Sequence, residues 1–168
     1  HTPHDNVHAL ATADLANGQR MMLMSSRSHG RILRSVDNGL SWSVVHGAGL
    51  ELCRVDRIVW DGHNDGQRFL IGGNRGVWAY QPLSNTVTKL DDGMGLGLKG
   101  YVTDMEAPQP GEGGPVLAST VDGYVMKLDR ETDRWHVSLD TGFQDERAQL
   151  AMTTKFRNGD DPGGAQTV

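Results

Sequence analysis

Cysteine is nearly absent from this sequence, with one residue, Cys53, among 168. No disulfide can therefore form within the chain, and no cluster of cysteines can hold a metal ion. Cys53 lies in the apolar stretch "LELCRV". That setting predicts a small buried side chain rather than a reactive nucleophile, because no general base can be assigned to the thiol.

Long apolar runs and an excess of positive charge are also missing. No run is long enough to cross a membrane as a helix. The formal net charge is -5, from 16 Lys and Arg against 21 Asp and Glu. This balance disfavours a nucleic-acid partner, which requires basic side chains against the phosphates. Helical periodicity is lacking too, since no segment keeps a 3.6-residue apolar period for three turns.

What the chain does contain is glycine, 22 residues scattered along its length, and a repeat. Gly30, Gly76 and Gly123 each open a strand-like run, with intervals of 46 and 47 residues. Upstream, the central apolar residues of "VHALATA", "VDRIVWD" and "VTDMEAP" are Leu10, Ile58 and Met105, which lie 48 and 47 residues apart. Trp42 and Trp135 both lie 12 residues after their glycine, and Thr88 has that place in the middle copy. Scattered glycine and short apolar runs indicate many tight turns between strands.

Four antiparallel strands in each unit of about 47 residues are typical of β-propeller blades. We therefore expect an all-β fold, one partial β-propeller over residues 1–168. The expected blades cover 7–49, 54–94 and 101–140, and 147–168 is the expected incomplete start of a fourth. Propellers close with at least about four blades. The chain is therefore expected to be either a fragment of a longer protein or one part of a ring that other chains complete.

The stretch "SVDNGLSW" carries a recognisable pattern, with Ser35, Asp37, Gly39 and Trp42 at fixed offsets. It resembles the Asp-box, S-x-D-x-G-x-x-W, of sialidase-type (BNR) repeat propellers. The third unit keeps only Asp129 and Trp135 of the pattern, and the second has lost both. An Asp in such a turn accepts hydrogen bonds from backbone N–H groups that lack strand partners. The resemblance implies a structural turn on the rim, not a catalytic acid.

Families with this repeat include glycoside hydrolases, so we looked for their active-site residues. Sialidases of this type use an arginine triad, an Arg-Ile-Pro motif and a Tyr–Glu pair, and the sequence offers none of these sets complete. Asp104 and Glu106, two residues apart on an inner strand, are the candidate catalytic pair of a xyloglucanase-like site. Side chains at i and i+2 of a strand share one face, so the two acids could equally serve to hydrate a central channel or bind a cation.

Histidines gather at the beginning of the chain, where His1 and His4 are candidate ligands for a transition metal if His1 is a mature N-terminus. A polar leader or a remnant before the first strand explains them equally well. The glycine-rich stretch 93–101, "GMGLGLKGY", resembles a phosphate loop, but no helix pattern follows it. We therefore expect a link between two blades there, and no cofactor is predicted.

Two main functions remain open after these exclusions. The leading hypothesis is a non-catalytic Asp-box propeller that acts as a protein-interaction or assembly module, as in the photosystem assembly-factor and sortilin-like branches. Its partner would be another protein or the remaining blades of the same protein. The alternative is part of a secreted glycoside hydrolase, xyloglucanase-like or sialidase-like, with a carbohydrate as ligand. A third possibility is one subunit of a composite ring. The resemblance implies an exported protein, periplasmic or extracellular.

Overall fold

The computed structural model describes residues 7–26, 31–62, 67–90, 101–109 and 112–140. Within these residues the chain forms twelve strands, and the longest helix is a single 3-10 turn, Leu50–Leu52. The expected all-β fold is therefore confirmed. None of the described helices is long and apolar enough to cross a membrane.

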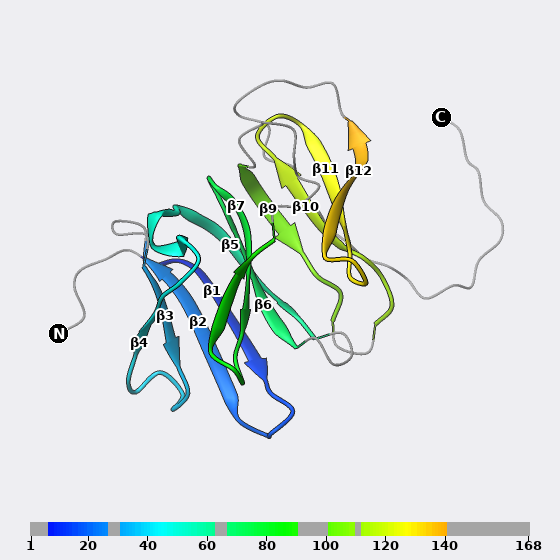
Figure 1. Ribbon diagram of the computed structural model, residues 1–168. Coiled ribbons are helices and arrows are strands. Elements are labelled where there is room, and N and C mark those ends of the chain that lie inside the picture. The colour runs from blue at the N-terminus through cyan, green and yellow to red at the C-terminus, as the bar shows by residue number, and fades with distance from the viewer. Residues whose placement is uncertain (1–6, 27–30, 63–66, 91–100, 110–111, 141–168) are drawn as a thin grey trace, which may run out of the picture.

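The twelve strands form three four-stranded antiparallel sheets in chain order (Figure 1). Blade 1 comprises β1 (Val7–Asp14), β2 (Arg20–Ser26), β3 (Ile32–Ser35) and β4 (Ser43–Val45). Blade 2 comprises β5 (Val55–Asp61), β6 (Arg68–Gly73), β7 (Gly76–Gln81) and β8 (Thr86–Lys89). Blade 3 comprises β9 (Val102–Glu106), β10 (Val116–Thr120), β11 (Tyr124–Asp129) and β12 (Arg134–Asp140). Within each sheet every strand pairs with the next along the chain, as in the blades of a propeller.

The blades stack face to face, with blade 2 in the middle of the fan (Figure 1). One apolar cluster joins blade 1 to blade 2 through residues such as Leu23, Ile32 and Ile71. A second joins blade 2 to blade 3 through Leu70 and Met105, among others. Because blade 2 is covered on both faces, every residue of β6 is buried, whereas β2 alternates between buried and partly exposed positions.

Strand pairing gives the three blades a common register. We define the rear row of a blade as four side chains, one from each strand, that lie side by side across the sheet and face the preceding blade. The pairing of the strands identifies the members of each row. The rows are Leu10–Met24–Leu33–Val44, Ile58–Ile71–Trp78–Lys89 and Met105–Ala118–Met126–Val137. Leu10, Ile58 and Met105 head these rows, which agrees with the repeat in the sequence.

The register corrects one alignment made from glycine spacing. Trp135 pairs with Leu128, two residues after Met126 in β11. The matching residue of β7 is Tyr80, two residues after Trp78, and Tyr80 pairs with Val87. Val87, not Thr88, therefore has the place of Trp135 in blade 2. Counting from the glycine gave the wrong residue because the rear-row residue of β7, Trp78, lies two residues after its glycine, whereas Met126 of β11 lies three residues after its own. Residues 147–168, the expected start of a fourth blade, lie outside the described part of the chain.

Candidate functional site: the groove along the inner strands

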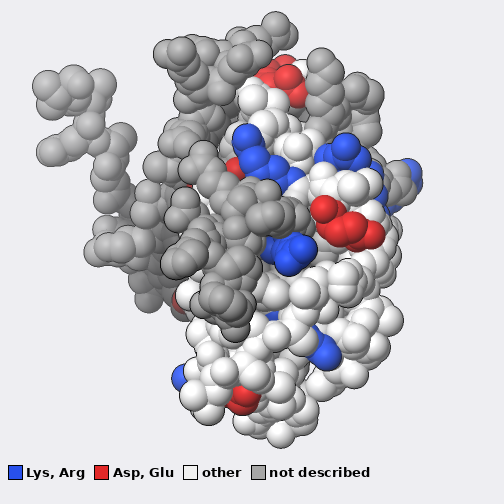
Figure 2. All heavy atoms as spheres, turned by 90° about the vertical axis from the view of Figure 1, so that its left-hand side faces the viewer, with Lys and Arg blue, Asp and Glu red and all other residues white. Residues whose placement is uncertain are grey.

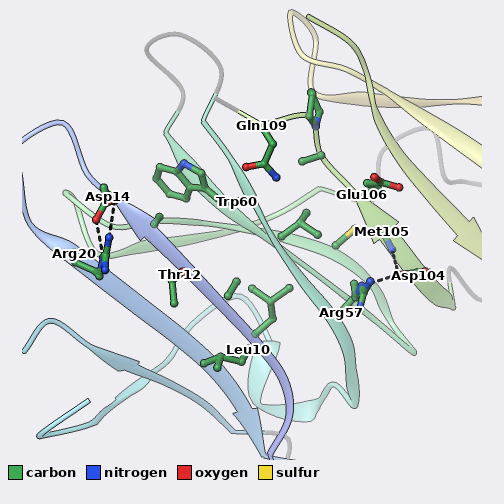
Figure 3. Close-up of a pocket in the computed structure, with 16 residues that line it drawn as sticks. Leu10, Thr12, Asp14, Arg20, Arg57, Trp60, Asp104, Met105, Glu106 and Gln109 are labelled. Carbon is green, nitrogen blue, oxygen red and sulfur yellow. Dashed lines mark hydrogen bonds and ion pairs between the residues drawn. The ribbon is translucent and has the colours of Figure 1, made fainter. Parts of the chain in front are cut away.

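The first strands of the three blades, β1, β5 and β9, lie next to one another and line an open groove of ≈ 800 Å³. Figure 3 shows the side chains that project into it, with β1 on one side and β9 on the other. Residues 107–109 continue the wall beyond β9. The groove is therefore the concave surface that a propeller presents toward its axis.

Asp104 and Glu106 both line this groove, as does Met105 between them. The Asp104 Oδ1 atom lies 2.6 Å from the Nε atom of Arg57 on the neighbouring inner strand (Figure 3). The same oxygen accepts a hydrogen bond from the Met105 N–H at 2.9 Å. Asp104 is thus held in an ion pair between blades 2 and 3, which gives it a positioning role.

The opposite end of the groove carries a second ion pair, Asp14 with Arg20 of blade 1 (Figure 3). Arg20 donates two hydrogen bonds to the carboxylate, at 2.8 and 3.0 Å, and both side chains are exposed. Hydrogen bonding from Arg20 lowers the pKa of Asp14 below its usual value. Half-buried Trp60 lies between the two ion pairs and packs against Phe69, with ring centroids 4.8 Å apart.

The described lining mixes charged, polar and apolar side chains. It presents two ion pairs, an indole, the Thr12 hydroxyl, the Gln109 amide and the Glu106 carboxylate. No Ser, Cys or His is among the described lining residues, so they contain no Ser–His or Cys–His pair. Such a surface can offer hydrogen bonds and apolar contacts to a peptide or to a sugar.

A polar cluster that the sequence did not predict lies where the inner strands begin. His8 Nε2 and Arg54 Nε lie 3.2 and 3.5 Å from Asp56 Oδ1. The Arg54 guanidinium also lies 5.0 Å from the centroid of the Tyr101 ring. These residues belong to three different blades in the repeat, and only the packing of the blades brings them together. The cluster therefore joins the blades at this end of the groove.

The four residues of the S-x-D-x-G-x-x-W pattern lie in and around the β3–β4 turn, and none of them lines the groove. Asp37 accepts hydrogen bonds from the Ser35 hydroxyl, at 2.7 Å, and from the Ser41 N–H, at 2.9 Å. Hydrogen bonds from Ser41 are the largest influence that lowers the pKa of Asp37, to about 2. Gly39 has a φ of 88°, where a Cβ would be strained, and its carbonyl accepts the Trp42 indole N–H at 3.1 Å. All four residues thus stabilise one turn.

The corresponding turn of blade 3 uses Asp129 in a similar way. Its carboxylate accepts hydrogen bonds from the Glu131 N–H at 2.9 Å and the Thr132 hydroxyl at 2.8 Å. These hydrogen bonds lower the pKa of Asp129, with that from Thr132 the largest cause. Trp135 differs from Trp42, because its indole N–H crosses to blade 2 and donates to the Leu90 carbonyl at 2.8 Å.

Three candidates from the sequence remain, namely the histidines at the beginning of the chain, the glycine-rich stretch and the single cysteine. His1 and His4 lie outside the described residues, as does most of the glycine-rich stretch 93–101. Among the described residues, no group of three or more His, Cys, Asp or Glu side chains could hold a metal ion. Cys53 is fully buried, and burial is the main cause that raises the pKa of its thiol to about 11.

No protein-family model and no curated protein sequence matches the chain. Among solved structures it is similar to BBS1N, solved in complex with ARL6DN and soaked with lead, at 13% sequence identity and a TM-score of 0.48. The similarity covers 82% of this chain and 41% of that one, so this chain spans about two fifths of the BBS1N chain.

Proposed function

We propose that this chain is a non-catalytic Asp-box β-propeller module that binds another protein or assembles with further blades. The observation that carries the proposal is the row Leu10–Met24–Leu33–Val44 across blade 1, which no described blade covers. Leu10, which heads this row and also lines the groove, is 54% exposed. The residues that head the equivalent rows, Ile58 and Met105, are 5% and 1% exposed. An apolar sheet face of this kind marks an interaction surface.

The Asp-box part of the proposal is supported by the hydrogen bonds of one turn. Ser35, Asp37, Gly39 and Trp42 each take part in the β3–β4 turn, as the pattern requires. In blade 3, Asp129 and Trp135 are the two residues that remain of the pattern, and each makes a hydrogen bond. The exported location rests on the same resemblance alone and stays a prediction, which fractionation of the source cells would test.

A glycoside hydrolase is the alternative, and the groove is the observation that favours it. Trp60, Glu106 and Gln109 line one open surface of ≈ 800 Å³. The ion pair between Asp104 and Arg57 argues against it, because an inverting or retaining hydrolase needs two carboxyl groups that flank the substrate. Two acids on one strand lie on the same side of the groove instead. Turnover of any member of a panel of β-glucans and sialosides by the purified chain would establish the alternative.

The interaction function is tested with extract of the source cells. The tagged chain, its Leu10→Arg variant and a Leu83→Arg control are used to capture proteins from the extract. Leu83 is 66% exposed in the β7–β8 turn, away from the rear row of blade 1. We expect a protein that the native chain and the control retain, that Leu10→Arg loses, and that rebinds when purified. If no captured protein depends on Leu10, the proposed function is wrong.

A further inference from the structure

We draw no further inference here: the strongest candidate, the surface of blade 1 around the row Leu10–Met24–Leu33–Val44, on the side of the molecule that Figure 2 shows, also carries the exposed Asp14–Arg20 ion pair, and nothing among the described residues shows what covers it.

Discussion

Arg68 donates two hydrogen bonds to Asp133 across the boundary between blades 2 and 3, at 3.0 and 2.6 Å. Arg68 is buried and also lies 3.4 Å from Asp61, whose side chain is 3% exposed. Arg130, beside Asp133 in the same turn of blade 3, contacts Asp61 at 3.0 Å. Burial acts to lower the pKa of Arg68, but Asp133 and Asp61 raise it overall. Charge as well as apolar packing therefore joins these blades.

Arg68→Met should destabilise the protein by about 2–3 kcal/mol, because it leaves buried Asp61 with one cationic partner in place of two. Urea denaturation followed by tryptophan fluorescence measures the change. Arg20→Met is the matched control, since Asp14 pairs with Arg20 at the equivalent end of β1 and β2. That pair is exposed, with side chains 68% and 60% accessible, so its loss should change little. Equal losses in the two variants would contradict the role given to burial.

Gly73→Ala should destabilise the protein more strongly than a typical surface change. A Cβ at this position would overlap the Arg54 carbonyl oxygen and lie 2.8 Å from Cys53 Sγ, so the segment directly before β5 would have to move. Overpacking of this kind costs about 1–3 kcal/mol or more. Gly113→Ala is the control, because a Cβ there meets nothing within 4 Å. Thermal melts of both variants measure the difference, and a neutral Gly73→Ala would mean that β5 and β6 yield easily.

The repeat made the fold predictable from the sequence. Leu10, Ile58 and Met105 recur at nearly constant intervals because each heads the same row of a similar sheet. Strand alternation alone predicts that Asp104 and Glu106 share one face of their strand. Such predictions succeed where the cause is local, namely the two-residue period of a strand or the hydrogen bonds of a turn.

Contacts between blades were not predictable in the same way. Arg57 pairs with Asp104, and Arg68 with Asp133, although 47 and 65 residues separate the partners. Any of the 21 acidic residues could have been chosen for either arginine from the sequence. Only the stacking of the sheets decides between them. The match of Thr88 with Trp135 was wrong for a similar reason. Strand pairing, and not the number of residues after a glycine, decides which residues of two blades are equivalent.

Cys53 should be inert in the folded protein. It is fully buried, and the raised pKa of about 11 leaves almost no thiolate near neutral pH. We expect a disulfide reagent such as Ellman's reagent to label no thiol in the native chain at pH 8, and one thiol per chain in guanidinium. Rapid labelling of the native protein would show that β5 opens readily, since the thiol lies directly before that strand.

Asp37 should link stability to pH in a defined window. Its folded pKa of about 2 lies below the ordinary value of 3.8, because Ser41 and Ser35 hydrogen-bond to the charged form. A lowered folded pKa means that the charged carboxylate contributes stability above pH 3.8, and that this contribution is lost as the pH falls toward 2. Asp37→Asn should therefore melt below the native protein at pH 7, and the two melting curves should converge at about pH 2.

Ser41→Ala separates this mechanism from a general effect of charge. Ser41 is the largest cause of the lowered pKa, through both its hydroxyl and its backbone N–H. The variant keeps the N–H and removes the hydroxyl, so the pKa of Asp37 should rise part of the way toward 3.8 while the net charge stays the same. Carboxyl ¹³C titration by NMR reads this pKa directly. An unchanged pKa in Ser41→Ala would mean that the turn does not hold Asp37 through its side-chain hydrogen bonds, and the Asp-box assignment would lose its physical basis.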